Sequence, residues 1–365
     1  MKPAQRVVVA ALATRALVHV AAVAGTRWPR PERLVHAAPD GHRYLFSPVP
    51  ALDALARWDS AFYLRIAAQG YVAPPSGAPH DAAFFPLYPW LLGALQRALG
   101  LDPVLAGLAV SAAAFALGVA ATYRLLADVA GEEEAADATV LLLAFPGSLF
   151  LSAVYTESLF LALSAGALLA ARRGRLGAAG ALAALAALTR PNGVLLVLPV
   201  GVEAFLAWRR GARVLPGALA LLLPPLALAA HAARLGRAYG DPLAFAHVQA
   251  QWGRGLAPPW RAFLAFNQDP EHYLVAFGGL AALWSAWRAR RQPASLQLHA
   301  ALALIVPICT GSLKSLPRFA GVAFPLFQTA ARWTRWRAAR VAWLAVSLGL
   351  LAWWSFRFGR GDGVN

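Results

Sequence analysis

The sequence predicts an all-α, polytopic membrane protein with about eleven transmembrane helices. Of its 365 residues, 59% are apolar and only 14% are charged, which leaves too little polar surface to cover a soluble core of that size. Several apolar runs also approach the roughly 20 residues that cross a hydrocarbon layer about 30 Å thick. We expect spans at 6–24, 103–127, 138–153, 156–171, 176–189, 193–208, 214–234, 272–288, 295–311, 318–331 and 341–357.

The first run follows a basic Met1-Lys2 start, as a secretion signal does, but its length and its Arg15 and His19 favour a retained helix. These two residues share one helical face, where either a packing partner or a lipid phosphate would compensate their burial. The runs at 138–153 and 176–189 fall short of a full crossing, so we expect tilted, broken or half-buried helices there.

The short connections predict the orientation, because Lys and Arg are retained on the cytoplasmic face. Arginines gather in four alternate connections, near residues 172–175, 209–213, 288–291 and 332–340. This pattern places the N-terminus in the cytoplasm and the C-terminus outside. It also explains the formal charge of +16 without nucleic-acid binding, and the single cysteine, Cys309, excludes a disulfide framework.

Two long segments fall on the extracytoplasmic side of the predicted single domain 1–365. They are the first outer loop, 25–102, and a second loop at 235–271. Within the first, residues 57–67 have apolar and aromatic side chains at helical spacing, which predicts an interfacial helix. A second interfacial helix is expected from Pro89 to Leu99.

Three carboxylates near this outer face are candidate functional groups. Asp59 lies beside Trp58, where partial desolvation would make it basic enough to accept a proton from a hydroxyl, although a capping role is the alternative. Asp81, next to His80, is either a second carboxylate, a metal ligand or a simple loop acid. Glu157 falls in a first helical turn, where it either caps the helix or takes part in function.

Three cations fall on the same face. Arg190 is the only charge on a tight turn between two apolar helices, where it either holds a phosphate or snorkels to the interface. Lys314 and Arg318 lie at the outer mouth of another span and either bind a phosphate or anchor anionic lipid. A basic Asp with separate cations at an apolar boundary suits group transfer from a lipid phosphate to a hydroxyl.

The motifs that carry these residues resemble those of the PIG-V-like mannosyltransferase family. They occur in the family's order over about residues 57–327, so the resemblance covers most of the chain. The matching blocks are Arg57-Trp58-Asp59 with Tyr63, Ile66, Gly70 and Tyr71, then Phe84-Phe85-Pro86-Leu87-Tyr88-Pro89, Tyr155-Thr156-Glu157-Ser158-Leu159-Phe160, Thr189-Arg190-Pro191-Asn192-Gly193 and Pro317-Arg318-Phe319 with Phe324-Pro325.

The resemblance implies a GT-C glycosyltransferase that moves a sugar, mannose in this family, from a polyprenyl-phosphate donor to an extracytoplasmic hydroxyl. Asp59 matches the family's essential acid and would be the general base of an inverting reaction, with Asp81 and Glu157 as further carboxylates. The chemistry of the cations, rather than a known role in the family, assigns Arg190, Arg318 and Lys314 to the donor phosphate. The other motif residues are expected to position donor or acceptor, and they are Arg57, Trp58, Tyr63, Tyr88, Tyr155 and Asn192.

Several questions stay open at this point. The composition suggests a bacterial plasma-membrane protein, and because bacteria lack GPI anchors the acceptor is a lipid-, glycan- or protein-linked hydroxyl. A divalent metal is compatible with the sequence but not required by it, since no strong ligand cluster occurs. A lipid or sugar transporter or flippase is the main alternative, and it would keep polar groups near the bilayer midplane, usually with inverted repeats. A non-catalytic membrane scaffold or polymerase partner is the third class of function that the sequence leaves open.

Overall fold

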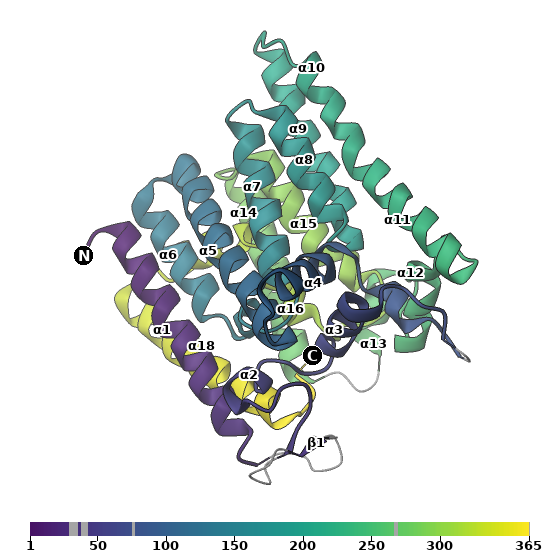
Figure 1. The fold of residues 1–365 in the computed structure, drawn as a ribbon. Helices are drawn as coiled ribbons and strands as arrows, with labels where there is room; N and C mark the ends of the chain where they lie inside the picture. Colours follow the sequence, from purple (N-terminus) through teal and green to yellow (C-terminus); the bar gives the residue numbers. More distant parts are fainter. Residues whose placement is uncertain (29–35, 38–42, 75–76, 266–268, 365) are drawn as a thin grey trace.

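The computed structural model describes residues 1–28, 36–37, 43–74, 77–265 and 269–364, and most of them are helical (Figure 1). Parts of both predicted outer loops, 25–102 and 235–271, lie outside the described residues. Two short strands of two residues each, β1 (His36–Ala37) and β2 (Arg43–Tyr44), pair antiparallel. The α-helices are α1 (Pro3–Gly25), α2 (Pro50–Asp53), α3 (Ser60–Gln69), α4 (Leu87–Leu99), α5 (Pro103–Ala130), α6 (Glu132–Ala144), α7 (Glu157–Arg172), α8 (Leu176–Ala187), α9 (Val197–Arg209), α10 (Leu215–Ala218), α11 (Leu223–Tyr239), α12 (Ala244–His247), α13 (Pro259–Leu264), α14 (Pro270–Ala289), α15 (Ala294–Ile308), α16 (Leu316–Ala320), α17 (Pro325–Trp333) and α18 (Arg337–Arg360), and the short 3₁₀ helices are η2 (His80–Ala83), η3 (Pro146–Leu151), η4 (Pro191–Leu196), η5 (Leu219–Leu222) and η6 (Val248–Trp252).

The predicted all-α membrane architecture is confirmed, and helices occupy all eleven predicted span positions. Within the described part of the chain, five continuous helical segments are long and apolar enough to cross a membrane by themselves, and α8 and α15 are shorter apolar helices. The total of eleven crossings stays a prediction. The five segments are Pro3–Gly25, Pro103–Ala130, Pro191–Arg209, Leu215–Tyr239 and Arg337–Arg360.

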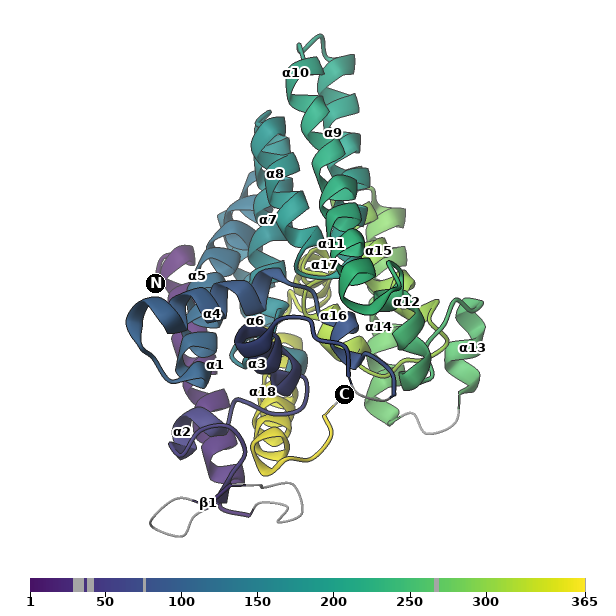
Figure 2. The same ribbon diagram turned by 45° about the vertical axis from the view of Figure 1, so that its right-hand side comes forward.

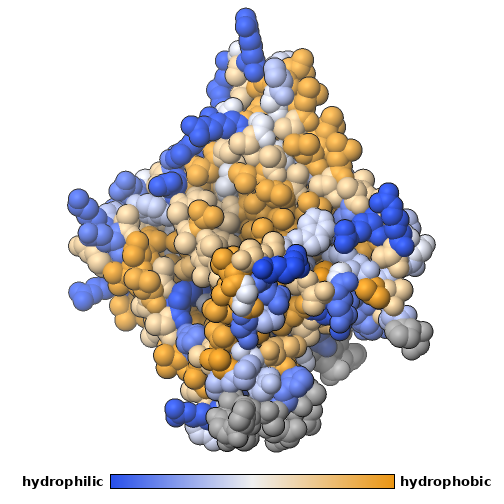
Figure 3. Space-filling view, in the orientation of Figure 1, coloured by the Kyte–Doolittle hydropathy of each residue, from blue (hydrophilic) through white to orange (hydrophobic). Residues whose placement is uncertain are grey.

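The surface carries apolar side chains of the kind that face lipid. In Figure 3, hydrophobic residues cover much of the middle of the face, and hydrophilic ones gather at its upper tip and edges. Large side chains such as Trp208, Leu226 and Trp284 are at least 60% exposed, far more than a soluble surface tolerates over so many positions. A hydrocarbon environment accounts for this exposure.

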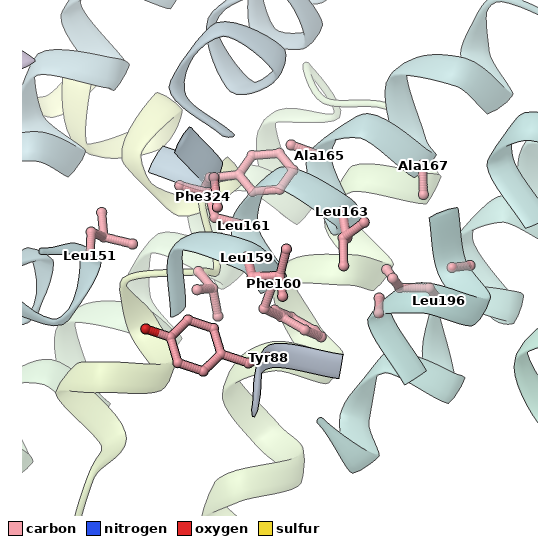
Figure 4. Close-up of a cluster of buried hydrophobic side chains, with 14 of the residues drawn as sticks. Tyr88, Leu151, Leu159, Phe160, Leu161, Leu163, Ala165, Ala167, Leu196 and Phe324 are labelled. Carbon is pink, nitrogen blue, oxygen red and sulfur yellow. The ribbon is translucent and has the colours of Figure 1, made fainter. Parts of the chain in front are cut away.

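Helix α7 forms the centre of the bundle, between α5 and α8. Its apolar residues continue around the helix, and a helix of that kind is stable only when neighbours surround it. Leu159, Phe160, Leu161 and Leu163 are all buried, and Figure 4 shows their side chains among those of Leu196, Phe324 and other core residues. This packing fixes the start of α7, where Glu157 lies.

The break expected within 138–153 falls at Pro146, and it supplies partners for the half-buried arginine of the first span. Helix α6 ends at Ala144, and η3 continues from Pro146. The Arg15 guanidinium of α1 donates hydrogen bonds to the carbonyl oxygen of Ser148 at 2.6 Å and to that of Leu143 at 3.3 Å. The Leu143 carbonyl lies in the last turn of α6, where a helix leaves its carbonyl groups without backbone donors. Of the two interpretations left open, the packing partner is therefore the one that the structure supports.

The predicted span at 318–331 differs from the structure because two helices replace it. Pro325 begins α17, where its missing N–H costs nothing, and α16 ends at Ala320. The backbone of α16 lies directly on η3, since a Cβ added to Gly147 would lie 2.2 Å from the carbonyl oxygen of Pro317. The break leaves Arg318 on a short helix of its own, beside the first outer loop.

The last helix, α18, packs against the first, α1. Helices α1 and α18 lie side by side in both views (Figures 1 and 2). Glycines permit the contact, because a Cβ on Gly359 would lie 1.9 Å from the carbonyl oxygen of Ala22. The two interfacial helices predicted in the first outer loop are present as α3 and α4. The end of α18 also contacts the turn that leads into α3, because Arg57 in that turn donates to the carbonyl oxygen of Gly359.

Candidate active site

The turn that carries Asp59 is fastened to the end of α18. Arg57 is buried and forms an ion pair with Asp53 at 2.8 Å, and its guanidinium also donates to the carbonyl oxygen of Gly359 at 3.2 Å. The Trp58 indole donates to the carbonyl oxygen of Asp362 at 3.0 Å. Trp58 adopts φ +53°, a left-handed conformation that costs energy in a bulky residue and persists only when its surroundings hold it.

The backbone N–H of Asp59 is hydrogen-bonded to Tyr155, so the Asp59 carboxylate can contact other groups. Its N–H donates to the hydroxyl of Tyr155 at 3.3 Å, and the same hydroxyl donates to the carbonyl oxygen of Arg57 at 3.2 Å. Burial raises the pKa of the Tyr155 hydroxyl well above its usual value, so the hydroxyl stays protonated and keeps donating. Tyr155 therefore positions the turn on which Asp59 lies.

The side chains of Asp59, Glu157, Arg190 and Arg318 meet in a row of alternating charge. Arg318 Nη1 donates to Asp59 Oδ2 at 2.6 Å, and Arg318 Nε donates to Glu157 Oε1. Arg190 Nη2 donates to the same Glu157 oxygen. The Glu157 side chain is only 1% exposed, so the two guanidinium groups supply the charge compensation that a buried carboxylate needs.

Aromatic rings support both arginines. The Arg318 guanidinium lies 4.8 Å from the ring centre of Tyr155, and that of Arg190 lies 5.2 Å from the ring centre of Phe319. Such cation–π contacts orient the planar groups while leaving their edges available for hydrogen bonds.

A cavity of about 780 Å³ opens in front of this row. That volume lies within the usual range for ligand sites. Asp59, Arg190 and Arg318 contribute to its wall, whereas Glu157 lies behind them and does not line it. The other wall is apolar and comes from η4, α9 and α15, with Leu195, Leu196, Pro199, Leu302, Ala303 and Val306.

Two further cations line the cavity. Lys314 is exposed, and the second, Arg254, comes from the loop after η6. Sequence reasoning missed Arg254, because the 235–271 segment matches no recognised pattern. Its one usable signal is an isolated arginine between Gly253 and Gly255 on the predicted outer face.

The predicted site residues fall into two groups. Trp58, Tyr63, Asn192 and Lys314 line the cavity with Asp59, Arg190 and Arg318. The second group does not line it, and its members act from behind the wall or elsewhere. Arg57, Tyr155 and Glu157 hold the cavity residues in place, and the Tyr88 hydroxyl is engaged with Ser111 and the carbonyl oxygen of Gly107, both at 2.9 Å.

Asp81 lies apart from this cluster. Its carboxylate accepts hydrogen bonds from Arg65 Nε at 3.0 and 3.1 Å, and it borders a separate, smaller pocket. The loop interpretation of Asp81 is therefore the one that its contacts favour. Over the residues that the structure describes, no three His, Cys, Asp or Glu side chains are grouped as metal ligands.

A family model described as Mannosyltransferase (PIG-V) matches residues 49–205. This match confirms the resemblance over the segment that contains Asp59, Glu157 and Arg190. No curated protein matches the chain.

Two solved structures share the fold. The oligosaccharyltransferase of Archaeoglobus fulgidus, in its apo form, aligns over 97% of this chain with a TM-score of 0.55 and 14% identity. This chain spans 56% of that protein's length. ArnT from Cupriavidus metallidurans, bound to undecaprenyl phosphate, aligns over 97% of this chain and 76% of its own, with a TM-score of 0.55 and 16% identity. The GT-C fold is thereby confirmed, and family match and fold together support a glycosyltransferase.

Proposed function

We propose that this chain, with its GT-C fold and its PIG-V mannosyltransferase match over residues 49–205, transfers mannose from a polyprenyl-phosphate donor to a hydroxyl acceptor. The observation that carries the proposal is the cavity itself, where one carboxylate and several cations face an apolar wall. A lipid-linked sugar phosphate has matching parts: an anion, a polar sugar and a long apolar chain.

Asp59 is the general base in this proposal. Arg318 occupies its Oδ2 atom, and among the described residues no side chain or backbone group hydrogen-bonds to Oδ1. Asp59 lines the cavity, where an acceptor hydroxyl can approach. A carboxylate bonded to Arg318, on a turn whose backbone is held by Tyr155, needs little reorganisation to accept a proton, which favours catalysis.

The step inverts the anomeric carbon. The acceptor oxygen attacks the anomeric carbon, and the bond from that carbon to the phosphate oxygen breaks. The acceptor's proton goes to Asp59, and the bonding electrons leave with polyprenyl phosphate. The cations of the cavity wall, Arg190, Arg318 and Lys314 among them, stabilise the departing phosphate.

The apolar wall provides room for the lipid chain. It runs between η4, α9 and α15, helices whose outer faces carry exposed apolar side chains such as Leu198 and Ile305. ArnT, of the same fold, has been seen with undecaprenyl phosphate, and a lipid of that chemical class is our proposed donor. With arginine clusters on the cytoplasmic side, the site faces away from the cytoplasm, at the plasma membrane of a bacterium.

The test is Asp59→Asn in the purified full chain with polyprenyl-phosphate mannose and a set of lipid, glycan and peptide acceptors. We expect a folded protein whose transfer rate falls at least a hundredfold, since general-base catalysis contributes about 10²–10⁴-fold. Asp241→Asn is the matched control, because Asp241 is an exposed acid that does not line the cavity. Full activity of Asp59→Asn would refute the assignment of the base. A wild-type chain that translocates lipid without transfer would support the transporter alternative.

A further inference from the structure

The charges around the cavity do not balance. Glu157 and Asp59 between them engage Arg190 and Arg318, so those two positive charges are matched by two negative ones. Arg254 and Lys314 line the same cavity, and in the described part of the chain neither lies within 4.0 Å of a carboxylate oxygen. Two positive charges therefore remain for a ligand.

The backbone around Arg254 is fixed on the end of α15. The N–H of Gly255 donates to the carbonyl oxygen of Thr310 at 3.1 Å, and that of Ala257 donates to the carbonyl oxygen of Cys309 at 2.8 Å. Gly253, just before Arg254, has φ +66°, a conformation that glycine adopts without strain. The loop thus presents Arg254 from a defined position.

The guanidinium of Arg254 is only partly engaged. Its Nη2 atom donates to the carbonyl oxygen of Lys314 at 3.2 Å and to Ser315 Oγ at 2.9 Å. Among the described residues, Nε and Nη1 make no hydrogen bonds. An arginine held through Nη2 keeps two charged donors, Nε on one edge of the guanidinium and Nη1 on another, and each of them can donate to a phosphate oxygen.

The pKa of Arg254 agrees with this geometry. Burial lowers it first, and the positive charges of Arg318 and Arg190 lower it further, while Asp59 acts in the opposite direction. A local excess of positive charge of this kind is relieved by a bound anion.

The proposed reaction generates such an anion. The phosphate of the donor is a diester with one negative charge, and after the bond to the anomeric carbon breaks it is a monoester with two. We propose that Arg254, together with Lys314, binds the lipid phosphate and takes up this second charge. The assignment rests on the proposed function. Arg190 and Arg318 also line the cavity, but their charges are already matched by Glu157 and Asp59, so the added negative charge falls mainly to Arg254 and Lys314.

This division of roles has a kinetic consequence. Interactions that grow as charge develops lower the barrier more than they strengthen donor binding. Loss of Arg254 should therefore reduce kcat more than it raises the KM for the donor, and it should weaken the product, polyprenyl phosphate, more than the donor.

The experiment compares Arg254→Gln, Arg254→Lys and Arg261→Gln in the purified full chain. Arg261 lies in the same outer segment, on α13, and does not line the cavity. Binding of farnesyl phosphate and of uncharged farnesol is measured directly, beside kcat and the KM of each substrate. Thermal melting in detergent checks folding, and Arg254→Lys retains the charge should Arg254→Gln disturb the loop.

We expect Arg254→Gln to weaken farnesyl phosphate binding about tenfold to a hundredfold and to leave farnesol binding unchanged. Arg254→Lys should recover part of the loss, and Arg261→Gln should behave as wild type. Wild-type affinity of Arg254→Gln for farnesyl phosphate would overturn the inference. So would a change confined to the acceptor KM, which would assign the cation to a phosphate of the acceptor. Absence of mannose transfer by the wild-type chain would instead contradict the proposed function, while the binding measurements still test Arg254.

Discussion

Replacing Glu157 by Gln tests whether one buried carboxylate holds the arginines of the site. The substitution keeps the shape of the side chain but removes its charge. Because both guanidinium groups meet at Oε1, they lie within about 5 Å of each other. With an effective dielectric constant of about 20, their mutual repulsion is then about 3 kcal/mol.

The expected loss of stability follows from that repulsion. Breaking a buried ion pair from one side usually costs about 3–5 kcal/mol, and the amide oxygen of Gln recovers part of this by accepting one hydrogen bond. We expect the free energy of unfolding to fall by about 3 kcal/mol. We also expect Arg318 to turn away from Asp59, so that the protein that remains folded has a much lower kcat.

The assay measures the melting temperature in detergent and the kcat per folded molecule. Glu203→Gln is the matched control, because Glu203 is also buried and pairs with Arg172 at 2.9 Å but does not line the cavity. The control should lose stability and keep its kcat. Wild-type stability and kcat in Glu157→Gln would refute the reasoning, and so would an equal loss of kcat in both variants.

Three further substitutions separate the site from its surroundings. Asp81→Asn should retain full kcat and lose about 1 kcal/mol or less of stability, because its partner Arg65 is 45% exposed and the pair lies outside the cavity; a hundredfold lower kcat in a transfer assay would contradict this. Gly147→Ala should destabilise the fold by about 1–3 kcal/mol and lower kcat, because the new Cβ would displace the backbone of Pro317 beside Arg318. Gly180→Ala creates a similar clash with Ala220, away from the cavity, and should lower the melting temperature without lowering kcat per folded molecule.

The helices could be predicted from the sequence because the bilayer imposes their length and composition. Every predicted span position carries helix, and the shortness of α8 and the break at Pro146 follow from local residues. The division into α16 and α17 did not follow, since the packing of Pro317 against Gly147 depends on a contact between distant segments.

The residues of the candidate site were predictable in kind, but their pairing was not. The outer face alone indicated that Asp59, Arg190 and Arg318 belong together. That Arg318 bridges Asp59 and Glu157, which are 259 and 161 positions away along the chain, is a property of the folded bundle. Arg254 lies in a segment without a recognisable motif, so only the fold identified it. Tyr88 belongs to a matching motif and nevertheless serves the core, because its hydroxyl is satisfied within the bundle.

The attachment of the Asp59 turn to α18 bears on the order in which the site is made during synthesis. Arg57 and the carbonyl of Gly359 to which it donates are separated by 302 positions. A ribosome releases the first outer loop long before the last helix, and early segments of a chain fold first. The turn that carries Asp59 therefore lacks the hydrogen bond from Arg57 to Gly359 until α18 has entered the membrane beside α1. A nascent or prematurely terminated chain that lacks α18 would contain Asp59 and all four cations of the cavity, but the turn that carries Asp59 would lack the contacts that hold it in place. Such an unfinished chain is therefore not expected to act on the lipids around it.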